Sequence, residues 1–228
     1  MKTFSHSPVS NKLEVFSYSP WRPDWFPPVS VTKKHQLPIL KAVQMNVDPT
    51  YVTSFIRSDD CKNHNQSLIH GYVDDSRLRS LTNNPASYLV KFANHLAVVT
   101  PDYSIKLGMP RHDRIRSVFM SRAIGAYFQY RALEVIPNIR WAEIEDLDFV
   151  LEGLPSDSVI ALSSQGIVGD SYLTSIFESG LSLVLEALHP SQIVFYGKET
   201  NNLRQLCSEY QLITFSTDIS RVHSRTSR

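Results

Sequence analysis

The sequence predicts an α/β domain with a mainly parallel sheet, and two observations favour this fold class. Short β-branched and apolar runs alternate with longer runs of helical periodicity, which is the pattern of repeated strand–helix units. The run at 96–100 (LAVVT) is apolar on both faces, as expected for a central strand of a parallel sheet. We expect five or six such units in an open doubly wound sheet or a partly closed, barrel-like sheet, and the periodicity is compatible with both.

Composition limits the class of protein. The 228 residues allow one large or two small domains, and 42% hydrophobic with 20% charged residues is ordinary for a globular chain. A formal net charge of +1 excludes a strong overall attraction to nucleic acid or membrane, although local patches can still bind either. The longest apolar runs are too short to span a bilayer, so we expect no membrane partner.

The cysteines and the amino-terminal residues indicate the expected compartment. Cys61 and Cys207 lie far apart and fit neither a disulfide framework nor a zinc site made of cysteines. The first residues lack the continuous apolar core of a secretory signal. The expected location is therefore cytoplasmic.

Residues 1–66 are expected to form an irregular arm and loop that pack on the main domain. The segment 17–30 (SYSPWRPDWFPPVS) contains four prolines and four aromatic residues, so neither a helix nor a central strand can persist there. Trp21, Trp25 and Phe26 are expected to anchor this arm by packing, and the alternative is a detachable arm that binds a protein or nucleic acid. The remaining boundaries are an α/β domain at 67–218 and a flexible basic tail at 219–228.

Within the domain, strand and helix patterns alternate in order. Residues 67–75 (SLIHGYVDD) predict a strand, and the next run predicts a helix interrupted near Pro85. Residues 112–131 give the best amphipathic pattern, with Phe119 and Ala123 on its apolar stripe. The other expected strands are 134–139, 158–162, 192–196 and 212–215, and the other expected helices are 143–151, 172–188 and 201–210.

Polar residues follow each predicted strand, and ligands bind α/β folds where the carboxyl ends of parallel strands converge. Asp102 follows the central strand and is a candidate acid/base or metal ligand, with Ser104 just behind it. Asn138 follows the next strand and is a candidate active-site amide, or a bridge across the loop. Asp102, Ser104 and Asn138 form the candidate catalytic set.

Arg140 and Trp141 are candidates for ligand binding. An arginine can hold a phosphate or carboxylate through two parallel hydrogen bonds, and a tryptophan can stack on a base. The alternative is a buried Arg–carboxylate pair with Trp141 filling the end of the core.

The loops after the next two predicted strands complete the candidate ligand-binding set. Hydroxyls and backbone amides of Ser163, Ser164 and Gly166 could contact a phosphate at a helix amino terminus, and Gly197 and Lys198 follow the neighbouring strand. The sequence contains neither GxGxxG nor a P-loop pattern, so the alternative is a plain connecting loop. No GxSxG elbow supports a serine nucleophile.

Two further groups of charged residues are candidate ligand sites. Asp74 and Asp75 are candidate ligands for Mg²⁺ or Mn²⁺, and the alternative is helix capping or turn closure. Arg122 lies on the inward stripe of the 112–131 helix and is also assigned to ligand binding. The other arginines of this helix could form a nucleic-acid face, but their spacing spreads them around the axis and favours an ion-paired or solvated surface.

An ordered set of sequence strings lies within residues 71–198. Those strings are YVDD, TPDYS, LGMP, a helix holding Arg122 and Gln129, VIPNIRW, EGLP, ALSSQGI and HPSQIVFYG. Through them the chain resembles the domain-of-unknown-function 4417 family of bacterial, phage and mobile-element proteins. The resemblance leaves the first seventy or so residues outside. The family typically has Phe at the position of Tyr103. The resemblance implies a mobile-element setting and no established reaction.

These patterns lead to two hypotheses of function. In the first, the strand ends recognise a nucleotide or nucleic acid through its phosphate, using Arg140 and the 163–166 loop, with Asp102 as acid/base or metal ligand. In the second, the protein is a non-catalytic module that binds a protein or nucleic acid through its arm and basic helix. The first hypothesis is compatible with an enzyme and with a binding protein.

Overall fold

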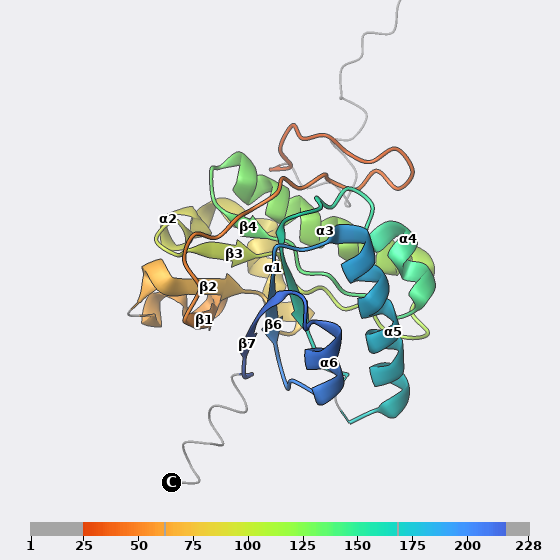
Figure 1. Cartoon of the computed structure of the whole chain (residues 1–228). Coiled ribbons are helices and arrows are strands. Elements are labelled where there is room, and N and C mark those ends of the chain that lie inside the picture. The colour runs from red at the N-terminus through yellow and green to blue at the C-terminus, as the bar shows by residue number, and fades with distance from the viewer. Residues whose placement is uncertain (1–24, 62, 168, 218–228) are drawn as a thin grey trace, which may run out of the picture.

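The strands follow one another around the sheet in the order in which they occur in the chain (Figure 1). The computed structural model describes residues 25–61, 63–167 and 169–217. Over these residues, one ladder has the order β1-β2-β3-β4 and a second has the order β5-β6-β7, with every neighbouring pair parallel. The strands are β1 Tyr51–Ser54, β2 Ser67–His70, β3 Ala97–Val99, β4 Val135–Ile136, β5 Val159–Ser163, β6 Gln192–Tyr196 and β7 Gln211–Phe215.

A short parallel bridge joins the two ladders. Asn138 pairs with Ala161, and the amide of Ile139 donates to the Ala161 carbonyl at 2.9 Å. The prediction of an α/β fold with a mainly parallel sheet is therefore confirmed. The helices are α1 Asp75–Asn83, α2 Leu89–Phe92, α3 Arg111–Tyr130, α4 Leu147–Val150, α5 Ser171–Leu188 and α6 Asn201–Leu206, with 3-10 turns at Phe55–Asp60, His64–Gln66, Pro85–Tyr88 and Ile144–Asp146.

The sheet curls strongly, as contacts between distant strands show. β2 and β6 are four strand spacings apart in the chain order, which would be about 19 Å in a flat sheet with spacings of about 4.8 Å. Yet the rings of His70, in β2, and of Tyr72, just after it, lie 4.6 Å and 4.7 Å from the ring of Tyr196 in β6. The fold is therefore barrel-like and partly closed rather than an open flat sheet.

Asp48 ties the two edges together at the other end of the strands. Its Oδ1 accepts hydrogen bonds from Gln192 Nε2 and Gln211 Nε2, both at 2.8 Å. Gln192 and Gln211 begin β6 and β7, and Asp48 lies just before β1. The first and last strands of the described sheet are thereby held near each other by one carboxylate.

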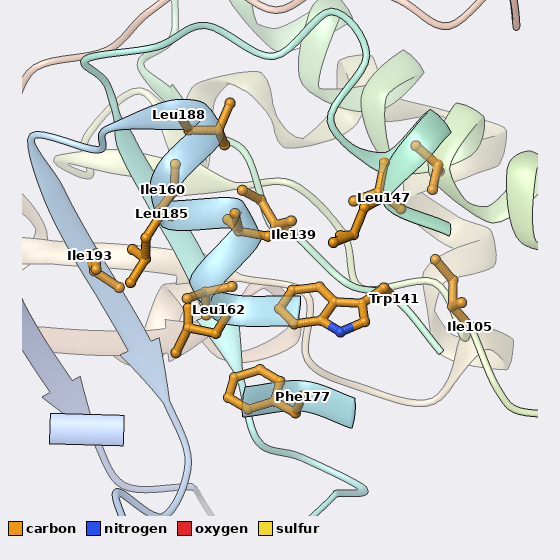
Figure 2. Packing of buried hydrophobic residues seen from close by; sticks show 14 of the residues in the cluster. Ile105, Ile139, Trp141, Leu147, Ile160, Leu162, Phe177, Leu185, Leu188 and Ile193 are labelled. Atoms are coloured by element: carbon orange, nitrogen blue, oxygen red, sulfur yellow. The ribbon is translucent and has the colours of Figure 1, made fainter. Parts of the chain in front are cut away.

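Apolar side chains fill both faces of this curled sheet. Alternate residues of the strands form the inner cluster, and the outer faces pack on helices. On the outside, Ile160 and Leu162 of β5 meet Phe177 and Leu185 of α5 (Figure 2). The inner cluster comprises Val43, Val52, Leu68, Tyr72, Ala97, Val99, Ile136, Val159, Ala161, Val194 and Tyr196.

The amino-terminal segment contacts α3 through its aromatic residues. The Trp25 ring meets Tyr127 edge-on at 5.5 Å and its Nε1 donates to the Thr82 carbonyl at 2.5 Å, while Phe26 stacks on Phe119 at 5.8 Å. Trp21 and the tail at 219–228 lie outside the described residues.

Two details of the predicted elements differ from the structure. No strand was predicted before Ser67, but β1 lies within the expected arm and loop and pairs along its full length with β2. In addition, β2 ends at His70, so Asp75 begins α1 instead of ending a strand. Across the residues with assigned positions, no helix is both long and apolar enough to cross a bilayer.

Candidate ligand site at the carboxyl ends of the strands

Asp102 is the centre of a hydrogen-bonded network where β3 and β4 end. Asn138 Nδ2 donates to Asp102 Oδ1 at 2.7 Å, and Arg140 Nη1 donates to Asp102 Oδ2 at 2.6 Å. The side chains of Asp102 and Arg140 are 10% and 20% exposed, so the ion pair is shielded but reaches solvent through Arg140. The structure thus brings together residues from two predicted strand ends, Asp102 from one and Asn138 and Arg140 from the next.

Asn138 is oriented by partners on neighbouring strands. Its backbone amide donates to Thr100 Oγ1 at 2.9 Å, and its side-chain Oδ1 accepts from the Tyr72 hydroxyl at 3.0 Å. Because a carboxylate only accepts hydrogen bonds, Asp102 fixes the Asn138 amide with its Nδ2 toward the carboxylate and its Oδ1 toward the Tyr72 hydroxyl. Tyr72 was not among the predicted site residues, although it opens the YVDD string, which was a usable signal.

Burial sets the electrostatics of this network. Desolvation raises the pKa of Asp102, and the opposing effects of Arg140 and of the Asn138 hydrogen bond do not cancel it. Burial also raises the pKa of Tyr72 well above its usual value, and the nearby Asp102 charge adds to that shift. Tyr72 is therefore a neutral donor, and Asp102 is a carboxyl whose proton affinity exceeds that of a surface aspartate.

Little empty space adjoins the network in this conformation. A cavity of about 20 Å³ is bordered by Pro101, Ser121, Asn138 and Arg140, which is room for about one water molecule. The exposed side of Arg140 is therefore the direction from which a larger ligand would reach Asp102.

Arg140 also connects the network to the loop after β5. Its Nη2 donates to the Gln165 carbonyl at 3.1 Å. Gly166 has φ +79°, and a Cβ there would lie 3.6 Å from Arg140 Nη2. The Arg140 guanidinium is thus shared between a carboxylate and a loop carbonyl, which reduces what it can offer to a phosphate.

Trp141 lies in the core, which was the alternative considered from the sequence. It is 7% exposed, its ring stacks on Phe177 at 5.2 Å with an interplanar angle of 1°, and its Nε1 donates to the Ile176 carbonyl at 3.3 Å (Figure 2). Gly180 leaves room for it, since a Cβ there would lie 2.3 Å from Trp141 Nε1. In this position the ring cannot stack on a ligand at the strand ends.

The serines after β5 bond to backbone groups. Ser163 Oγ accepts from the Gln165 amide at 3.0 Å, and Ser164 Oγ accepts from the Lys198 amide at 3.0 Å. Gly197 has φ +143°, and a Cβ there would lie 2.1 Å from Ser164 Oγ. These contacts fix the loops after β5 and β6 to each other.

The amino terminus of α5, the expected phosphate position, already has an anion. The Asp170 carboxylate caps it by accepting from the amides of Tyr172 and Leu173 at 2.9 Å and 3.1 Å. A phosphate would have to displace this carboxylate or meet its repulsion. The geometry therefore disfavours phosphate binding by the 163–166 loop at this helix.

Asp75, a predicted metal ligand, forms hydrogen bonds with Ser104. Its carboxylate accepts from the Ser104 amide and the Ser104 hydroxyl, both at 3.1 Å, so Ser104 faces α1 and not the Asp102 network. Asp74 is the N-cap residue of α1 but makes no side-chain capping bond. Within the described ranges, no group of three or more His, Cys, Asp or Glu side chains is arranged to hold a metal ion.

Arg122 and Gln129 connect α3 to segments that are distant in the sequence. The buried Arg122 guanidinium donates to the carbonyls of Val150 and Glu152, which follow or end α4. Gln129 exchanges two hydrogen bonds with the backbone of Lys41, at 3.0 Å and 2.9 Å. The Arg122 side chain is thus used inside the fold, and burial lowers its pKa to about 10.

Two of the four arginines of α3, Arg111 and Arg114, pair with acidic residues. Arg111 Nη2 lies 2.8 Å from Asp148, and Arg114 lies 2.6 Å from Glu143 and 3.0 Å from Asp146. These pairs leave less free positive charge on α3 than the sequence indicates. The ion-paired alternative therefore applies to Arg111 and Arg114.

Comparison with known proteins gives one family and two phage relatives. A family described as a domain of unknown function (DUF4417) matches residues 29–215. The Gene 1 protein of Mycobacterium phage L5 is 31% identical over 152 residues, which is 66% of this chain and 66% of that protein. The Gene 1 protein of Mycobacterium phage D29 is 30% identical over 155 residues, covering 65% of this chain and 57% of that protein.

The extent of these matches corrects one expectation. The resemblance seen in the sequence left the first seventy or so residues outside, but the matched region begins at residue 29. It therefore includes β1 and Lys41, whose backbone forms hydrogen bonds with Gln129. The matched regions span just under two thirds of the L5 protein and 57% of the D29 protein.

Proposed function

The chain belongs to the domain-of-unknown-function 4417 family, and we propose that this phage-associated protein binds a nucleotide, free or within a nucleic acid, at the carboxyl ends of its strands. The observation that carries the proposal is the Tyr72–Asn138–Asp102–Arg140 network. It combines a carboxylate, an amide and a guanidinium on adjacent strand ends, where ligands bind in parallel α/β folds.

The network retains capacity for hydrogen bonds to a ligand. Each Asp102 oxygen accepts one of the bonds described above, while a carboxylate offers about four acceptor positions. Arg140 uses two of its five donors. Planar groups of this kind match the donors and acceptors on the edges of nucleobases. Base or sugar contacts fit this site better than a phosphate contact, because Asp102 neutralises Arg140 and Asp170 occupies the start of α5.

If the protein is an enzyme, Asp102 is the residue we expect to move a proton. Burial raises the pKa of Asp102, so this carboxyl takes up a proton more readily than a surface aspartate does. Tyr72 and Asn138 would position it. Mg²⁺ or Mn²⁺ would have to be held with the help of the ligand, since Asp75 bonds to Ser104.

Thermal unfolding with nucleoside monophosphates and short single- and double-stranded DNA and RNA, with and without Mg²⁺ or Mn²⁺, tests the proposal. A ligand at about a hundred times its dissociation constant stabilises by about 2.7 kcal/mol. For a domain of this size that raises Tm by roughly 5–10 °C. Arg140→Ala and Asp102→Asn should abolish the shift, whereas Arg79→Ala, an exposed arginine on α1, should retain it.

Two results would count against the strand-end site. One is the absence of any shift with the whole panel. The other is a shift that survives in Arg140→Ala but disappears when residues 1–24 are deleted, a truncation that leaves β1 in place. The second result would support the alternative, a non-catalytic module that binds a protein or nucleic acid through its arm.

A further inference from the structure

A second cavity lies beyond the Asp102 network, at the carboxyl ends of β5 and β6 between α5 and α6. Its volume is about 180 Å³, and its apolar wall includes Phe177, Phe195 and Leu203, all three buried. In another protein, an engineered apolar cavity of about 150 Å³ binds benzene. This cavity can therefore accept a ring or a branched aliphatic group of similar size.

Two opposite charges line the same cavity without pairing with each other. Glu178 comes from α5 and Lys198 follows β6, and no ion pair joins them in the part of the chain with assigned positions. Glu178 Oε2 accepts from Asn202 Nδ2 at 2.6 Å, while the Lys198 backbone amide is held by Ser164 Oγ. The Lys198 ammonium group has no ion-pair partner among the described residues.

The combination of an apolar wall with two separated charges defines a ligand class. A purely anionic ligand would attract Lys198 but repel Glu178 in the same cavity. A purely cationic ligand would attract Glu178 but repel Lys198. A ligand with both charges avoids this conflict. We propose that the cavity binds a free hydrophobic α-amino acid, with its carboxylate toward Lys198, its ammonium toward Glu178 and its side chain against Phe177 and Phe195.

This inference goes beyond the proposed nucleotide site and does not depend on it. Phe177 lines the cavity, and its ring also stacks on the Trp141 ring (Figure 2). Occupancy should therefore change Trp141 fluorescence through Phe177, while Asp102→Asn should leave amino-acid binding unchanged.

Isothermal titration of the full chain with L-phenylalanine and three analogues tests the charges separately. The analogues are phenethylamine, which lacks the carboxylate, 3-phenylpropionate, which lacks the ammonium, and L-alanine, which lacks the ring. We expect L-phenylalanine to bind with a dissociation constant of about 1 mM or lower. Each analogue should bind about tenfold more weakly, because each loses a charge-assisted contact or the apolar burial.

Variants then assign each charge to its residue. Lys198→Ala should weaken L-phenylalanine about tenfold and leave phenethylamine unchanged, and Glu178→Gln should weaken L-phenylalanine but not 3-phenylpropionate. Lys106→Ala and Glu186→Gln, exposed residues elsewhere, serve as matched controls. Thr174→Phe, which adds a ring to the lining, should abolish binding of all four compounds while the variant unfolds cooperatively.

Several outcomes would overturn the proposal. Wild-type protein that gives no binding heat and no fluorescence change with L-phenylalanine excludes this ligand class. Equal affinity for L-phenylalanine and phenethylamine would remove the role of Lys198. Binding that persists in Thr174→Phe would place the ligand outside this cavity.

Discussion

Gly180 on α5 is where a single methyl group should have the clearest effect on stability. A Cβ at this position would lie 2.3 Å from Nε1, 2.5 Å from Cε2 and 2.9 Å from Cζ2 of Trp141. The indole cannot move away easily, because it stacks on Phe177 and donates to the Ile176 carbonyl. Gly180→Ala therefore forces a buried ring out of a defined position.

Two opposing effects determine the size of that change. Alanine is favoured over glycine inside a helix by about 1 kcal/mol. Overpacking of a well-packed core costs about 1–3 kcal/mol. Since the clash involves a ring fixed on both sides, we expect the upper part of that range and a net loss of about 1–2 kcal/mol in the free energy of unfolding.

Urea denaturation followed by Trp fluorescence measures this loss, and Ser179→Ala on the exposed side of α5 is the matched control. The control should stay within about 0.5 kcal/mol of wild type. A stabilised Gly180→Ala variant with unchanged Trp141 emission would refute the reasoning, because it would mean that the ring adapts without cost.

Two further predictions concern the strand-end loops. Since burial raises the pKa of Asp102, its folded form holds a proton more tightly than its unfolded form, and its contribution to stability declines as pH rises from about 3.9 to the raised folded value. The unfolding free energy of wild type minus that of Asp102→Asn should therefore fall with pH across that window in urea titrations, and a difference that rises with pH would contradict the shift. Gly197→Ala should cost about 2 kcal/mol or more in the same assay, through a φ of +143° and the contact with Ser164 Oγ. Adding Ser164→Ala should recover part of that loss, and no recovery at all would show that the hydroxyl contact is unimportant.

The strands that could be predicted from the sequence are those whose own residues are apolar and β-branched. β3, β5 and β6 are apolar on both faces and fully buried, so a parallel assignment followed from composition alone. β1 was not predicted, because Tyr51–Ser54 has only four residues, lies at a sheet edge and alternates exposed with buried positions. Its strand character comes from its pairing with β2 and not from its own residues.

The candidate site could be predicted in outline but not in its pairings. Asp102 follows one predicted strand, and Asn138 and Arg140 lie at the end of the next, and the carboxyl ends of neighbouring parallel strands meet at one edge of the sheet. The partner of Asp75 could not be found this way, since Ser104 lies 29 residues away and meets it only after α1 and the β3 loop are in place. Trp141 likewise depends on Gly180, a residue whose importance appears only when α5 packs on the strand ends.

Asp48 has a consequence for the order in which the protein assembles and opens. The carboxylate joins β6 and β7 to the residues before β1, and its bond to Gln211 closes a loop of 163 residues. Neighbouring strands in this fold are also neighbours in the chain, so their pairing requires only short loops to close. The contact between Asp48 and Gln211 closes a far longer loop than the pairing of neighbouring strands does, so it costs more loop-closure entropy and should form late. Local unfolding should therefore start where Asp48 joins the residues before β1 to the beginning of β7.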